Sequence, residues 1–127
     1  METTETVRTA QEVCELSVPI VSSIKNAAKR FKKEGRIEDA DFAERLITIM
    51  VTEVQIYEEM EKCDEESDTL SSEESFEAFK VIEEKELLNM IALFELIDSN
   101  RELYIELTGV KVSKEYLDGM RKLRKSI

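Results

Sequence analysis

The chain has 127 residues, and its 18 basic and 29 acidic side chains give a formal net charge of -11 at pH 7. It contains two cysteines and no histidine, which excludes a disulfide scaffold and any Ser-His-Asp or Cys-His catalytic arrangement. Hydrophobic residues make up 42% of the chain, enough to form the core of a single domain over residues 1–127.

Glycine and proline are sparse, with three glycines and one proline in the whole chain. Strands need turn residues about every eight to twelve positions, and this chain has nowhere to place them. Good helix formers dominate instead. The sequence therefore predicts an all-α fold, an up-and-down antiparallel four-helix bundle with a broken fourth helix. Residues 1–5 are expected to be disordered, and residues 64–71 to form an acidic loop.

The first helical stretch is expected over residues 5–34 and is stopped by Gly35, with cations in its last turn. Pro19 interrupts the stretch, because its ring crowds the carbonyl four residues back. Either the helix kinks at Pro19 or a second helix begins just before it, and we favour the kink. The next helix is expected over residues 37–66, with apolar side chains around roughly 240° of its circumference.

The third helix is expected over residues 72–97, with Ser71 as its N-terminal cap. Its centre, residues 87–97, is apolar on nearly every side, and only Asn89 and Glu95 break the run. Such a segment is too short for a membrane span and should be buried by protein all round. We therefore expect a contact with another subunit through Leu87, Leu88, Met90, Ile91, Leu93, Phe94, Leu96 and Ile97.

The fourth stretch is expected in two pieces. Ser99, followed three residues later by a glutamate, predicts the start of a short helix over residues 100–107. Gly109 stops this helix, and Ser113 caps a last helix that runs to about residue 125.

The charge is unevenly distributed along the chain. Residues 37–106 carry 22 acidic and five basic side chains, whereas residues 107–127 carry six basic and two acidic ones. A large acidic field beside the basic end argues against nucleic acid as a partner. In an up-and-down bundle, the basic residues Arg121, Lys122, Arg124 and Lys125 should neutralise the loop acids Asp64, Glu65, Glu66 and Asp68, within one subunit or between two. The alternative is that the charged segments form a docking surface for an outside partner.

Carboxylates three residues apart share a helix face and can hold Mg²⁺. Glu58 with Glu61, and Glu83 with Glu86, have this spacing. On neighbouring helices such pairs resemble those of all-α nucleoside triphosphate pyrophosphohydrolases of the MazG kind. The resemblance is limited to the spacing, which arises many times by chance among 29 acidic residues.

Glu53 breaks the pattern of the second helix, because it points into the apolar arc. A buried lone carboxylate is costly unless it is paired or protonated. Lys85 is level with Glu53 across the second turn and is its expected partner. Glu95, inside the apolar centre of the third helix, is the second inward carboxylate. Either residue belongs to an ion pair or subunit contact, or to a ligand or metal site.

Taken together, these patterns predict a cytoplasmic, non-catalytic bundle that acts through self-association or partner binding. A homodimer is the expected assembly, because twofold closure is the commonest. No cofactor, nucleic acid or membrane is expected, and Cys14 and Cys63 are expected to be reduced and buried. One alternative is a small-molecule or metal-binding bundle, such as a MazG-like, Mg²⁺-dependent nucleotide pyrophosphohydrolase. Another is an acidic regulator or decoy.

Overall fold

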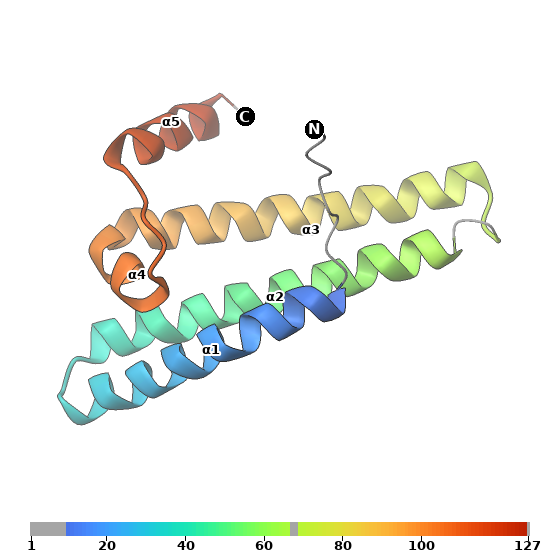
Figure 1. The fold of residues 1–127 in the computed structure, drawn as a ribbon. Helices are drawn as coiled ribbons and strands as arrows, with labels where there is room; N and C mark the ends of the chain where they lie inside the picture. Colours follow the sequence, from blue (N-terminus) through green and yellow to red (C-terminus); the bar gives the residue numbers. More distant parts are fainter. Residues whose placement is uncertain (1–9, 67–68, 127) are drawn as a thin grey trace, which may run out of the picture.

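The computed structural model describes residues 10–66 and 69–126. This part of the chain is built from helices alone and contains no strand, which confirms the all-α class. Residues 1–5, predicted to be disordered, and Asp68 of the acidic loop lie outside the described residues. The helices are α1 (Ala10–Lys33), α2 (Ile37–Glu66), α3 (Ser72–Ser99), α4 (Arg101–Thr108) and α5 (Lys114–Lys125) (Figure 1).

The three long helices follow one another up and down, and α2 is the one on which both α1 and α3 pack (Figure 1). The short helix α4 contacts α1 and α3 at one end of this arrangement, and α5 packs mainly on α3. The expected fourth helix is therefore broken, as predicted. Its two pieces pack on different neighbours because the chain turns at Gly109.

Short capping motifs fix the helix ends. Gly35 and Gly109 have φ values of +78° and +73°, in the left-handed region that glycine adopts without strain. Ser71 and Ser113 cap α3 and α5, as their sequence positions predict: Ser71 Oγ accepts from the N–H of Glu74 at 3.2 Å. These local signals explain why the predicted and observed ends of α2, α3 and α5 agree within two residues.

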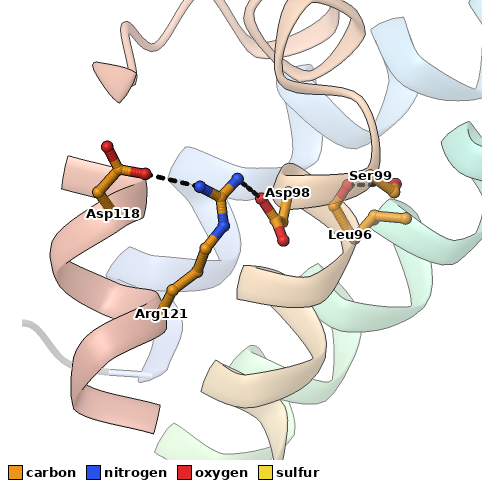
Figure 2. A network of polar contacts seen from close by, with 5 residues as sticks. All are labelled: Leu96, Asp98, Ser99, Asp118 and Arg121. Atoms are coloured by element: carbon orange, nitrogen blue, oxygen red, sulfur yellow. Dashed lines mark hydrogen bonds and ion pairs between the residues drawn. The ribbon is translucent and has the colours of Figure 1, made fainter. Parts of the chain in front are cut away.

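One local expectation is wrong. The N-cap of α4 is Asn100, whose Oδ1 accepts from the N–H of Leu103 at 3.1 Å. Ser99, the predicted cap, is the last residue of α3 and donates instead to the carbonyl of Leu96 (Figure 2). At Pro19, α1 continues as one helix, which agrees with the favoured interpretation that no second helix begins there.

The main core lies at the end of the molecule where α1 turns into α2. Phe31, Ile24 and Leu46 are almost completely buried there, and Leu96 of α3 and Leu103 of α4 close the cluster. Smaller clusters hold α5 to α3 and the far ends of α2 and α3 together. The packing is densest at one end, and it leaves space next to α4.

The main core gives a direct test of the fold. Leu46→Ala should lower the free energy of unfolding by about 2–5 kcal/mol, because it opens a cavity among fully buried side chains. The matched control is Val51→Ala on the same helix, where the side chain is exposed and the expected loss is about 0.5 kcal/mol or less. Urea denaturation followed by circular dichroism measures both, and equal losses would contradict the described packing.

Candidate functional site

A cavity of about 350 Å³ opens where α4 meets the three long helices. Ile20 of α1 lines one side, and Val110, just after α4, lines another. Two acidic side chains, Glu53 of α2 and Glu86 of α3, lie among mainly apolar neighbours. The remaining lining residues are Leu46, Ile49, Met50, Asn89, Met90, Leu93, Tyr104 and Thr108.

Asn89 is the buried polar side chain that orders this site. Its Nδ2 donates two hydrogen bonds from α3 to α2, one to Glu53 Oε2 at 2.9 Å and one to the carbonyl oxygen of Ile49 at 3.2 Å. Buried polar groups are stable in such places only when they are bonded. The amide therefore fixes the Glu53 carboxylate at the wall of the cavity.

Glu86 faces Glu53 across the seam between α2 and α3. The pKa of Glu86 rises from 4.5 to about 7, first because burial disfavours its charged form and second because the Glu53 charge lies beside it. A hydrogen bond between the two carboxyl groups contributes as well. Among the described residues, no donor reaches the buried Oε2 of an ionised Glu86. Glu86 therefore keeps its proton to a higher pH than an ordinary glutamate does.

The expected pairing of Glu53 with Lys85 is wrong. Lys85 Nζ binds both carboxylate oxygens of Glu59, at 2.9 and 3.0 Å. Lys85 and Glu86 are adjacent on α3, so their side chains point in different directions around the helix. Glu86 points to Glu53, and Lys85 lies at the other edge of the contact between α2 and α3. The sequence identified Glu53 as the inward carboxylate, but it did not identify Glu86 and Asn89 as its partners. The signal that could have found them is their spacing of three residues on one face of α3.

Glu95 does not share the cavity of Glu53. It is exposed, forms an ion pair with Arg124 of α5, and lines a separate surface hollow with Arg45 and Ser99. The apolar sequence around Glu95 therefore does not indicate a buried carboxylate, because this side of α3 faces α5 and water. Of the two inward candidates, Glu53 alone lies in the cavity.

The acidic pairs with metal-binding spacing do not come together. In the two described stretches, no group of three or more acidic or cysteine side chains is placed to hold a metal ion. Glu58 and Glu83 are exposed, and Glu61 accepts a hydrogen bond from the backbone N–H of Ala10. The constellation that the MazG-like alternative requires from Glu58, Glu61, Glu83 and Glu86 is therefore not formed.

Within the described residues of one chain, the ion pairs that the basic end makes to another helix go to α3. Arg121 forms ion pairs with Asp118 of its own helix and with Asp98 of α3 (Figure 2). The Arg121 hydrogen bond holds the pKa of Asp98 below its usual value. Arg124 pairs with Glu95 one turn earlier on α3. Helix α5 therefore runs back along the second half of α3, antiparallel to it (Figure 1).

The residues predicted to form a subunit contact fall into two groups. Phe94, Leu96 and Ile97 are buried within the single chain, and Ile91 and Leu93 are half-buried. Leu87, Leu88 and Met90 are 43%, 67% and 50% exposed. The single chain thus covers the C-terminal part of this apolar segment and leaves its N-terminal part open.

Cys63 is buried and Cys14 is exposed, and both are free thiols. The expectation that both would be buried is therefore wrong for Cys14.

Across residues 10–66 and 69–126, none of the helices combines the length and the apolar character that a bilayer crossing requires. Comparison with known proteins found no matching family model, no matching curated protein and no matching solved structure.

The carboxyl pair makes stability depend on pH in a defined direction. The pKa of Glu86 is raised in the folded state, so the folded protein holds this proton more tightly than the unfolded chain does. The free energy of unfolding should therefore fall as the pH rises from about 4.5 to about 7.

Glu86→Gln removes this titration. At pH 8, the free energy of unfolding of the variant should exceed that of the natural chain by about 1–2 kcal/mol, because the variant lacks the repulsion between two ionised carboxylates. The gain is limited to this size because Glu86 is partly exposed and water screens the repulsion. The control is Glu84→Gln, an exposed acid on the same helix that keeps the pair intact. Urea denaturation at pH 5 and pH 8 measures both variants. A fall in the free energy of unfolding between pH 5 and pH 8 that is as large in Glu86→Gln as in the natural chain would contradict this assignment.

Proposed function

We propose that this protein is a non-catalytic, cytoplasmic helical protein that acts by association, and that its partner is a second copy of itself. The observation that carries the proposal is a stripe of exposed apolar side chains on α3. It consists of Phe76, Phe79, Leu87 and Met90, and we call it the α3 stripe.

Helical spacing places these four side chains on one face. Phe76 and Leu87 are eleven residues apart, as are Phe79 and Met90, and eleven residues make about three turns of helix. Each pair therefore lies on one line along α3. The exposed fraction of Phe76 is 66%, and even the best covered of the four, Phe79, is 37% exposed. The stripe consists of two exposed apolar pairs on one face, with the exposed Glu83 between them. Exposed apolar residues of this size on one face are typical of interaction surfaces.

The charges beside the stripe favour an antiparallel contact between two copies. The first half of α3 carries an excess of glutamates, including Glu73, Glu74 and Glu77. The second half of α3 carries α5, whose last turns contain Lys122 and Lys125, both exposed. In a twofold contact along α3, the acidic half of one copy lies beside the basic helix of the other. Complementary charge of this kind orients an interface whose stability comes from apolar burial.

The cytoplasmic part of the proposal is supported by the two cysteines. Both thiols are free, and Cys14 is exposed, a state that a reducing compartment preserves.

The mass in solution tests this proposal. Size-exclusion chromatography with light scattering should give twice the chain mass of 14.7 kDa. The double variant Phe76→Glu, Phe79→Glu should run as a monomer, because it places charges within the apolar contact. Both side chains are partly open to water, so circular dichroism should show an unchanged helix content.

The matched control for this measurement is Val18→Glu, an exposed apolar residue on α1 outside the stripe, which should leave the dimer intact. A natural chain that remains a 14.7 kDa monomer at all concentrations would rule out self-association.

A further inference from the structure

We propose that the cavity between α1, α2, α3 and α4 binds a small organic cation, a primary ammonium on a short apolar body, and that Glu53 and Glu86 hold the ammonium group. This site lies inside one subunit. Met90 of the α3 stripe also lines this cavity, but Phe76 and Phe79, the residues changed to break the dimer, do not. The cavity can therefore be tested in a variant that does not self-associate.

The need for a positive charge follows from the two carboxyl groups. The titratable side chains that line the cavity are Glu53 of α2, Glu86 of α3 and Tyr104 of α4, whereas α1 contributes Ile20. Burial raises the pKa of Tyr104, so its phenol stays neutral. Among residues 10–66 and 69–126, no basic side chain lines the cavity. When both carboxyl groups are ionised, no cation of the described chain therefore sits between them, and a ligand can supply one.

The hydrogen-bonding pattern fits an ammonium group. Asn89 already donates to Glu53 Oε2 and holds that carboxylate in place. When Glu86 is ionised, its buried Oε2 has no donor from the described part of the chain and can accept a hydrogen bond from a ligand. A primary ammonium carries three N–H donors and no acceptor, so it can bind both carboxylates at once.

The other lining residues of the cavity indicate what kind of group is attached to the ammonium. Apart from the two acids, Asn89, Tyr104 and Thr108, the cavity wall is formed by aliphatic side chains and methionines. A volume of about 350 Å³ is at the small end of the range of about 300–1,000 Å³ that is usual for ligand sites. A short aryl or alkyl chain fits this wall. A mainly apolar wall suits such a chain better than the bound waters that Mg²⁺ keeps around it.

The test uses 3-phenylpropylamine as the probe and 3-phenylpropan-1-ol as its neutral counterpart of the same shape. Binding to the full chain is measured by calorimetry and by ¹H–¹⁵N NMR, where the side-chain amide of Asn89 reports on this site alone. We expect the amine to bind saturably, to shift the Asn89 amide signal, and to bind about tenfold more tightly than the alcohol, because a charged hydrogen bond is lost in the alcohol.

Two further measurements test whether the carboxyl pair binds the amine. Glu86→Gln should weaken amine binding about tenfold and leave alcohol binding unchanged, whereas Glu84→Gln, on an exposed part of the same helix, should change neither. Affinity for the amine should rise about tenfold between pH 6 and pH 8, because the ammonium replaces the proton that the pair shares at lower pH.

The proposal is overturned if the amine and the alcohol bind equally, if neither binds, or if Glu86→Gln binds the amine as well as the natural chain does. A shift of the Asn89 amide by MgCl₂ but not by the amine would also overturn it, in favour of a metal site. The oligomeric state is measured separately, so a dimer that binds no amine rejects this inference and leaves the proposed self-association intact.

Discussion

Two carboxyl groups that face each other in a partly buried contact between two helices need one positive charge between them. Glu53 and Glu86 are in this position, and the pKa of Glu86, about 7, shows that a proton is the charge available within the chain. The seam between α2 and α3 is therefore sensitive to pH near neutrality, and the cavity beside it attracts cations. A helical protein with an ordinary apolar seam would have neither property.

This site exists because the fourth helix is too short to fill the space beside the other three. The eight-residue helix α4 closes one end of the space, and α5 turns back along α3. Apolar side chains that a full-length fourth helix would cover are left open on α1 and α3, including Ile20 and Met90. Because α4 is short, it leaves both the cavity and the α3 stripe uncovered. A small ligand would cover the apolar wall of the cavity, and a second copy of the chain would cover the stripe.

The sequence predicts the helices well because their ends are set by local chemistry. Gly35, Ser71 and Ser113 stop or start helices through bonds made within a few residues. The inward direction of Glu53 is also local, since the periodicity of α2 places it in the apolar arc. The partners of Glu53 are not predictable in this way. A change of one residue on α3 rotates the side chain by about 100°, and this rotation separates the expected partner Lys85 from the observed partner Glu86.

The account depends most directly on the shared proton of the carboxyl pair. Carbon-detected NMR titration of the side-chain carboxyl groups measures it without any ligand. We expect one carboxyl signal of the Glu53–Glu86 pair to titrate near pH 7, and the elevated value to fall when Glu53 is replaced by glutamine, since the neighbouring charge is then absent. Two independent titrations near the ordinary glutamate value of 4.5 would contradict the account.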